Sequence, residues 1–252
     1  MQKVCIVIPC YNEQDRLPIR DFIESYNNFS WYFYFVNDGS TDKTLEVLNN
    51  LKDGREDRIM IFNHNINKGK AEAVRSGVLM ASEWSNFDLI GFFDADLSTP
   101  LYEIERLMES FKINTQMVVG SRMKRLGANI IRNPFRHYFG RVFSTIVSFM
   151  LQIPVYDSQC GAKLFRTEFA KKAFDEKFLT PWLFDVEIFA RLIILVGLKN
   201  VSNSVKEIPL VEWIEKGKSK LGFSTMIKVP FDLLKIFIYI KRNQVKIVNY
   251  QK

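Results

Sequence analysis

The chain has 252 residues and carries 35 Lys and Arg against 28 Asp and Glu, which gives a formal net charge of +7. Hydrophobic residues make up 47% of it and charged residues 25%, which excludes disordered and low-complexity classes and predicts one domain with a short appendage. The three cysteines form no Cys-x-x-Cys or Cys/His cluster. This pattern argues against a zinc site and a disulfide framework, and it predicts reduced, intracellular thiols.

The positive charge is concentrated in two segments. Residues 121–156 hold six basic residues and no acidic one, and residues 216–252 hold nine basic residues and one acidic one, Asp232. Both segments are also apolar, but neither contains an uncharged apolar stretch of the roughly 18 residues that a membrane-spanning helix needs. This distribution suggests nucleic acid, a membrane surface or a phosphorylated ligand as the partner.

The first 120 residues alternate between apolar runs and helical patterns. The apolar runs predict strands at 3–9, 31–36, 58–62, 88–93 and 117–119. The helical patterns lie between them, at roughly 15–28, 41–52, 69–84 and 101–113. This alternation is typical of β-α-β units and predicts an α/β fold with a mainly parallel sheet flanked by helices.

After residue 120 the alternation stops. Helices are predicted over 135–152 and, mostly buried, over 183–196. Residues 205–213 are predicted to form an edge strand, because Pro209 cannot donate a hydrogen bond to a neighbouring strand. A last, amphipathic helix is predicted after Pro230. Its polar stripe consists of Lys228, Asp232, Lys235, Tyr239 and Arg242.

Acidic motifs follow three of the predicted strands. They are Tyr11-Asn12-Glu13, Asn37-Asp38-Gly39-Ser40 and Asp94-Ala95-Asp96. Each motif alone also reads as an ordinary turn or helix cap. In an open parallel sheet, however, ligands bind outside the carboxyl ends of the strands, so the three motifs together predict one acidic crevice.

Converging carboxylates repel one another unless a cation or hydrogen-bond donors lie among them. Oxygen ligands suit Mg²⁺ or Mn²⁺, which commonly bridges carboxylates to a diphosphate. The chain has no Gly-x-x-x-x-Gly-Lys-Ser/Thr loop and no Gly-x-Gly-x-x-Gly after the first strand. A P-loop nucleoside triphosphatase and a Rossmann dinucleotide site are therefore unsupported.

The motifs VIPCYNE, VNDGSTDKT, NKGKAEAVRSG, DADLSTP and GSR, in this order, resemble family 2 glycosyltransferases with the GT-A nucleotide-sugar-binding fold. The resemblance covers residues 3–122. In the second half, the segments DSQCGAKLF, WLFDVEIF and VEWIEKGKSKL resemble the dolichyl-phosphate β-glucosyltransferase branch and its polyprenyl-phosphate relatives.

The resemblance implies roles for the motif residues. The nucleoside pocket would be lined by Pro9, Tyr11 and Glu13, with Asp38 holding the base or ribose. The pyrophosphate side would be closed by Gly69 and Lys70. Asp94 and Asp96, on either side of Ala95, would hold the metal under the sugar diphosphate. Arg122 would meet a phosphate, and a loop with Lys218, Ser219 and Lys220 would cover the diphosphate.

Four residues are expected to carry catalysis: Asp96, Arg122, Asp157 and Lys220. Asp157 is interpreted as orienting the acceptor phosphate, although a turn before Gly161 would also explain it. Asp185 and Glu187 lie on an otherwise apolar helix, so they must pair with Arg166 or Arg191 or else reach the site, Asp185 foremost. Cys160 reads as a packed residue, and His64 and His137 carry no motif.

The implied reaction is inverting transfer of a hexose, glucose from UDP-glucose, to a polyprenyl phosphate, with Mg²⁺ or Mn²⁺ as cofactor. The domain would span 1–222, and 223–252 would form a basic helix and tail at the membrane interface, on the cytoplasmic face. Residues 135–152 are a second candidate for membrane contact. The alternatives are another donor such as GDP-mannose, a non-lipid acceptor in cell-surface polysaccharide synthesis, or nucleic-acid binding. Nothing but the net charge favours nucleic acid, so it is not expected as a partner; the oligomeric state is left open.

Overall fold

The computed structural model describes residues 2–216 and 223–250, except the side chains of 223–227 and 244–250. Its centre is a seven-stranded sheet in the order β3-β2-β1-β4-β7-β5-β8. β7 is antiparallel to both of its neighbours, and the other strands run parallel to one another. The strands are β1 (Val4–Cys10), β2 (Tyr32–Asp38), β3 (Ile59–His64), β4 (Leu89–Phe93), β5 (Met117–Ser121), β7 (Ala162–Arg166) and β8 (Val205–Pro209).

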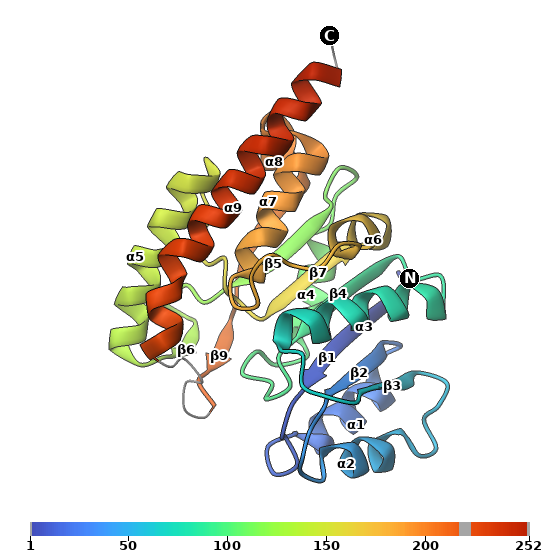
Figure 1. The fold of residues 1–252 in the computed structure, drawn as a ribbon. Coiled ribbons are helices and arrows are strands. Elements are labelled where there is room, and N and C mark those ends of the chain that lie inside the picture. The colour runs from blue at the N-terminus through green and yellow to red at the C-terminus, as the bar shows by residue number, and fades with distance from the viewer. Residues whose placement is uncertain (1, 217–222, 251–252) are drawn as a thin grey trace.

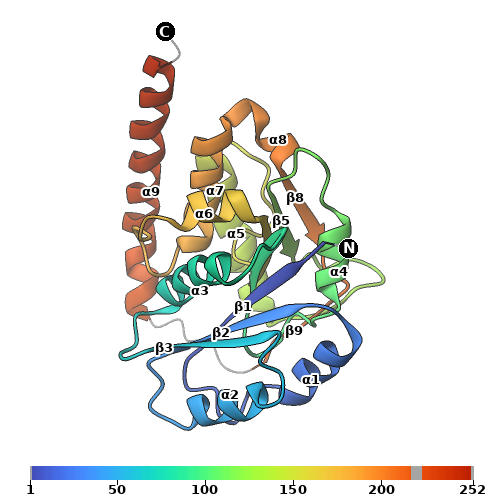
Figure 2. The ribbon, with the colours of Figure 1, turned by 90° about the vertical axis from the view of Figure 1, so that its right-hand side faces the viewer.

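Helices cover both faces of this sheet (Figures 1 and 2). Alternate residues of β1 enter two separate cores, Val4 and Ile6 on one face and Cys5 and Val7 on the other. The first core is closed by α1 (Ile19–Asn28), α2 (Thr44–Lys52) and α4 (Glu103–Glu109). The second is closed by α3 (Lys70–Trp84), α6 (Thr167–Phe174) and α7 (Phe184–Val196). The expected helix-flanked, mainly parallel sheet is confirmed.

The second half of the chain differs in detail from what its sequence predicts. The segment predicted as one edge strand, 205–213, divides into β8, at the edge of the large sheet, and β9 (Glu212–Ile214). β9 pairs in parallel with β6 (Asn129–Ile131) to form a separate two-stranded sheet, and Pro209 ends β8. A short helical turn (Leu198–Asn200) and α8 (Val201–Ser204) lead into β8.

The last helix, α9 (Phe223–Tyr250), begins well before Pro230, so the prediction that the helix follows this proline is wrong. Pro230 has no N–H to donate to the carbonyl four residues earlier in the helix. Because Pro230 is exposed, water can donate a hydrogen bond to that carbonyl instead. The helix packs against α5 (Pro134–Leu151) and α7 and then extends past the body of the molecule (Figure 2). Ile236 and Ile240 enter the core, so this part of α9 packs as an integral element.

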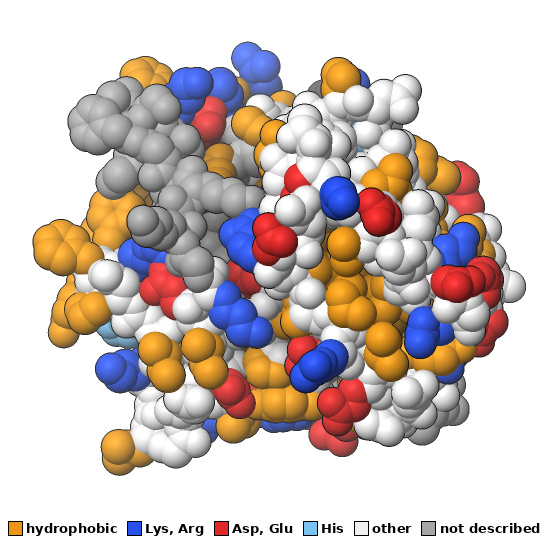
Figure 3. Space-filling view, turned by 90° about the horizontal axis from the view of Figure 1, so that it is seen from below, with side chains coloured by type: hydrophobic (Ala, Val, Ile, Leu, Met, Phe, Trp, Pro, Cys, Tyr) orange, Lys and Arg blue, Asp and Glu red, His pale blue; other side chains and the backbone are white. Residues whose placement is uncertain are grey.

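Both α5 and α9 expose large apolar side chains. On α5, Phe135 is 88% exposed and Phe149 87%, and Tyr138, Phe139 and Ile146 are also exposed. On α9 the exposed apolar residues include Phe231 and Leu234, whereas Asp232, from the predicted polar stripe, is buried. Seen from below, hydrophobic side chains are exposed both on the side where α5 lies and in the middle of the face (Figure 3). Over 2–216 and 223–250, no helix has both the length and the apolar character to cross a bilayer.

Candidate active site

The polar motifs predicted from the sequence meet at one edge of the large sheet. β1 is parallel to both β2 and β4, so the loops that follow these three strands emerge side by side. Cys10 is paired with Asn37 at the end of the β1–β2 ladder. The loops carry the three acidic motifs, so the strand order places these motifs at one edge of the sheet, as predicted from the sequence.

The loops after β1 and β2 are locked together by hydrogen bonds. Asn12, in a left-handed conformation (φ 53°), accepts a hydrogen bond from the backbone of Thr41 (2.9 Å), and its own N–H donates to Ser40 Oγ (3.0 Å). Glu13 N–H donates to Thr44 Oγ1 (2.7 Å), and the Glu13 carboxylate pairs with Arg16 (2.7 Å). Tyr11 is exposed and Pro9 half-buried at this edge, and Glu13 is buried.

Asp38 holds the loop that leads into α3. Its carboxylate accepts hydrogen bonds from the backbone N–H of Lys68 (3.0 Å) and Gly69 (2.8 Å) and contacts His64 Nδ1 at 2.7 Å. Gly69, at φ 88°, adopts a backbone conformation that favours glycine and places Lys70 at the first position of α3. Asp38 is therefore the anchor of the Gly69-Lys70 turn, and its predicted contact with the nucleoside stays a prediction.

The carboxylates after β4 lie beside the ammonium of Lys70. Asp94 forms an ion pair with Lys70, and Asp96 accepts a hydrogen bond from the backbone of Ser98 (2.9 Å). Burial, and then the charge of Asp94, raise the pKa of Asp96 above its ordinary value. Burial alone would lower the pKa of Lys70, but Asp94, Asp185 and Asp96 outweigh it and raise this pKa. The negative charges of these carboxylates thus favour a cation among them.

Asp185 joins this cluster from α7. It is buried and receives the ammonium of Lys163 at 2.5 Å, and Lys163, fully buried on β7, also donates to the carbonyl of Cys160 (2.6 Å). The partner of Asp185 is thus Lys163 and not Arg166 or Arg191. Its charge also acts on Lys70, and its expected role in the site stays a prediction. The pairing of Glu187 with Arg191, at 2.8 Å, is confirmed.

Arg122 and Asp157 form a two-pronged ion pair at the end of β5. Arg122 donates from Nε (2.6 Å) and Nη2 (2.7 Å) to the two carboxylate oxygens, and its backbone N–H also donates to Asp157 (3.1 Å). Burial alone would raise the pKa of Asp157, but the charge and hydrogen bonds of Arg122 lower it to about 2. Asp157 is thus ionised at neutral pH and fixes the orientation of Arg122.

Glu207 on β8 supports this pair from behind. Its carboxylate accepts hydrogen bonds from the backbone N–H of Tyr156 (2.8 Å) and Asp157 (2.6 Å). Burial raises the pKa of Glu207.

Arg132 lies nearby, at the end of β6. Burial, and then the neighbouring Arg122, lower its pKa to about 10. Among the described residues, no group accepts a hydrogen bond from the Arg132 guanidinium. This site can therefore take an anion.

Lys163, Glu207 and Arg132 are absent from the set predicted from the sequence. Lys163 lies within the segment DSQCGAKLF, but the resemblance assigned it no role. Glu207 lies in none of the quoted motifs, and the only signal for Arg132 is the cluster of basic residues over 121–156. Lys218, Ser219 and Lys220, predicted to cover the diphosphate, lie outside the described residues. Cys160 is buried with a pKa raised by burial to about 12, as suits a packed thiol.

Within the described part of the chain, no three His, Cys, Asp or Glu side chains form a ready-made metal site. Asp94 and Asp96 nevertheless fit a divalent cation, because they are neighbouring oxygen donors and a positive charge already rests against one of them. A diphosphate could complete such a coordination shell.

Residues 5–174 match the family described as glycosyl transferase family 2. A dolichyl-phosphate β-glucosyltransferase of Trichomonas vaginalis is 36% identical over 93% of this chain and 71% of its own length. The Saccharomyces cerevisiae protein of the same name is 31% identical over 91% of this chain and 72% of its own length.

Two solved structures show the same fold. Glucosyl-3-phosphoglycerate synthase from Mycobacterium tuberculosis, in complex with Mn²⁺, uridine diphosphate and phosphoglyceric acid, superposes with a TM-score of 0.67 at 13% identity. The match covers 94% of this chain and 78% of that one. Mannosyl-3-phosphoglycerate synthase from Rubrobacter xylanophilus also gives 0.67 at 13% identity, over 97% of this chain and 75% of that one. The likeness confirms the GT-A fold expected from the sequence motifs.

Proposed function

Because the chain belongs to glycosyl transferase family 2, we propose that it transfers glucose from UDP-glucose to a dolichyl-type polyprenyl phosphate at a membrane surface. One observation carries this proposal: two groups of charged side chains lie close together. The acidic cluster consists of Asp94, Asp96 and Asp185, and the arginine cluster consists of Arg122 and Arg132. Asp94 of the first cluster lies close enough to Arg122 of the second to help raise the pKa of the arginine. A donor diphosphate and an acceptor phosphate can therefore be held side by side.

The acidic cluster suits the donor. Asp94 and Asp96 would hold Mg²⁺ or Mn²⁺, which neutralises charge on the departing UDP. Lys70 opens α3, and the N-terminus of a helix attracts phosphate groups. When the metal and the diphosphate are bound, the Lys70 ammonium would turn from Asp94 to a phosphate oxygen. The nucleoside would lie over the loops after β1 and β2, against Pro9 and Tyr11.

The arginine cluster suits the acceptor. A phosphate monoester loses its second proton at a pKa of about 6, so its oxygen is already a nucleophile near neutral pH and needs no strong base. Arg132, half-buried, would bind the phosphate, and Arg122 would orient it. Asp157 binds Arg122 through both of its oxygens, so it acts as a positioning residue for that arginine. In-line attack on the anomeric carbon would convert an α-linked donor into a β-linked product.

The exposed apolar faces of α5 and α9 support contact with a membrane. Phe149 on α5 and Phe231 on α9 are exposed, and α9 also exposes Lys235, Lys241 and Arg242. Helices that join a broad apolar face to basic residues bind in the interface of anionic bilayers. The three cysteines are buried and free, which fits the cytoplasmic face of that membrane.

A panel of donors and acceptors tests the reaction. UDP-glucose, GDP-mannose and UDP-N-acetylglucosamine would each be offered with dolichyl phosphate and with a soluble sugar, and products would be identified by mass. We expect glucosyl phospholipid from UDP-glucose alone, loss of product with EDTA, and loss of product in Asp96→Asn with the fold retained. Transfer to the soluble sugar, or from GDP-mannose in preference, would favour the alternative reactions.

Membrane contact is tested by charge reversal. Changing Lys235, Lys241 and Arg242 to Glu should weaken binding to anionic liposomes by several powers of ten at low salt, since each basic residue near such a surface contributes about 1 kcal/mol. Transfer to a short, water-soluble phosphate acceptor should survive the change. Unaltered liposome binding would assign the membrane contact to α5 instead.

A further inference from the structure

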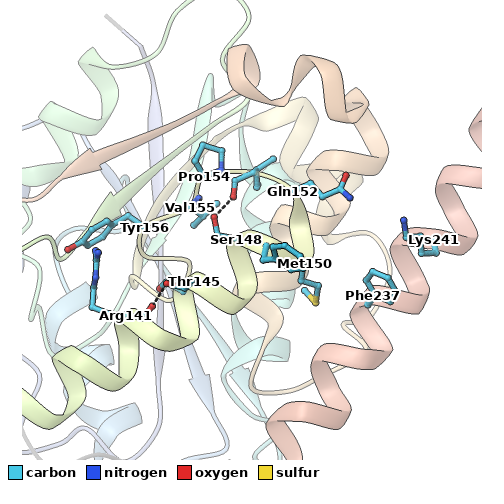
Figure 4. Close-up of a pocket in the computed structure, with 13 residues that line it drawn as sticks. Arg141, Thr145, Ser148, Met150, Gln152, Pro154, Val155, Tyr156, Phe237 and Lys241 are labelled. Atoms are coloured by element: carbon cyan, nitrogen blue, oxygen red, sulfur yellow. Dashed lines mark hydrogen bonds between the residues drawn. The ribbon is translucent and has the colours of Figure 1, made fainter.

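A groove of about 900 Å³ runs between α5, the segment 152–156 and α9 (Figure 4). Met150 lies in its middle, between the side chains of the 153–156 segment and Phe237 of α9. The volume falls within the range of about 300–1,000 Å³ that is typical of small-ligand sites. None of the described residues assigned above to the donor or to the acceptor phosphate lines this groove.

Two of the hydroxyl groups that line the groove, those of Ser148 and Thr145, are already hydrogen-bonded within the protein. Ser148 Oγ donates to the carbonyl of Ile153 (2.6 Å) and accepts from the backbone N–H of Val155 (3.2 Å). Thr145 Oγ1 donates to the carbonyl of Arg141 (2.9 Å). These hydroxyls therefore do not require a polar ligand, and the walls between them are apolar.

The two ends of the groove are positively charged. At one end, the guanidinium of Arg141 lies 3.9 Å from the ring centre of Tyr156, and at the other, Lys241 lies 5.5 Å from the ring centre of Phe237. Figure 4 shows these pairs on opposite sides of Met150. None of the described lining residues is acidic, so the groove favours an apolar molecule with an anionic end.

The Tyr156 end adjoins the arginine cluster. Tyr156 precedes Asp157, which holds Arg122, and Glu207 binds the backbone of both residues. At the other side the groove is bordered by Phe149, which is almost fully exposed on the face of α5. A chain lying in the groove would therefore pass from the acceptor phosphate toward the apolar surface of α5 and α9.

We propose that this groove binds the isoprenoid chain of the acceptor, with the first units beside Tyr156 and Arg141. The inference rests on the proposed function for the identity of the ligand. It adds that the chain is recognised by the protein and is not merely dissolved in the bilayer, so that the enzyme distinguishes acceptors by the isoprene units nearest the phosphate.

Filling the groove tests this inference without relying on catalysis. Thr145 is exposed on α5 and lines the groove, and Val142, one turn earlier, is exposed but does not line it. Binding of geranylgeranyl phosphate, UDP-glucose and inorganic phosphate would be measured by calorimetry in solution, without bilayers. The variants are Thr145→Trp, Val142→Trp as the matched control, and Thr145→Val, which removes the hydroxyl and keeps the size.

We expect Thr145→Trp to weaken geranylgeranyl phosphate binding by about tenfold or more, with UDP-glucose and inorganic phosphate bound as by wild type. Val142→Trp and Thr145→Val should retain lipid binding, and UDP-glucose binding reports that each variant is folded. Equal binding of geranylgeranyl phosphate by Thr145→Trp and wild type would overturn the groove assignment, even if glucose is transferred. Selective loss of binding in a protein that transfers no glucose would uphold the groove and reject the proposed reaction.

Discussion

Gly161 lies against the carboxylate of Asp94, and replacing it with alanine should disturb the donor site directly. A Cβ at this position would stand 2.8 Å from Asp94 Oδ1 and still closer to Oδ2, whereas ordinary contact begins at 3.4 Å. Gly161 precedes β7 in the middle of the sheet, so the backbone cannot easily yield. Asp94 must therefore move, and a displacement of roughly 1 Å can cost about a hundredfold in rate.

The assay is kcat/KM for glucose transfer, with Mn²⁺ affinity in the presence of UDP measured separately. We expect Gly161→Ala to lose about two powers of ten in kcat/KM and to bind Mn²⁺ more weakly. Gly54→Ala is a control, because a Cβ there meets nothing within 4 Å and its positive φ affects stability only. Wild-type kcat/KM in a folded Gly161→Ala protein would refute the argument that the position of Asp94 governs catalysis.

Three further predictions concern the ion pairs around the site. Lys70→Met should tighten Mn²⁺ binding to the donor-free protein, because Asp94 loses its ammonium partner, while weakening UDP-glucose binding; calorimetry that finds Mn²⁺ bound less well would contradict the assignment. Glu207→Gln should cost about 1–3 kcal/mol in urea unfolding, because one backbone N–H is left facing an amide donor, and kcat/KM should fall with it. The pKa of Asp157 is about 2, below the ordinary value of about 3.9, so its contribution to stability is complete above pH 4 and is lost as the pH falls toward 2. The difference in unfolding free energy between wild type and Asp157→Asn should accordingly shrink by about 2 kcal/mol between pH 5 and pH 2, and a difference independent of pH would show that the pair does not titrate as described.

The first half of the fold follows from local patterns. Buried runs such as 3–9 and 88–93 are bounded by turn residues and separated by helices, so both the strands and their parallel arrangement were accessible from the sequence. β7 was not predicted, because its place between β4 and β5 depends on partners more than 40 residues away in the chain. The start of α9 was wrongly predicted to follow Pro230, because an exposed proline can be tolerated inside a long helix that packs on the core.

The residues of the candidate site also fall into those that the sequence predicts and those that depend on distant partners. Asp94 and Asp96 could be named because acidic motifs at the carboxyl ends of parallel strands meet at one edge of the sheet. Lys70 was named only through the resemblance of its motif to family 2 glycosyltransferases, and the structure pairs it with Asp94. Glu207 and Lys163 could not, because a buried charge is recognised only through the group that compensates it, here a backbone turn and the carboxylate of Asp185. The pairing of Arg122 with Asp157 joins two residues that had been predicted separately, each as a contact to phosphate.

One measurement tests the central claim most directly. Purified protein would be incubated with UDP-[¹³C]glucose, dolichyl phosphate and Mn²⁺, and the lipid fraction would be examined by NMR for the configuration at the anomeric carbon. The account predicts a glucose joined to the lipid phosphate through a β linkage, absent when the metal is withheld. An α-linked product, or label confined to free glucose and UDP-glucose, would contradict it.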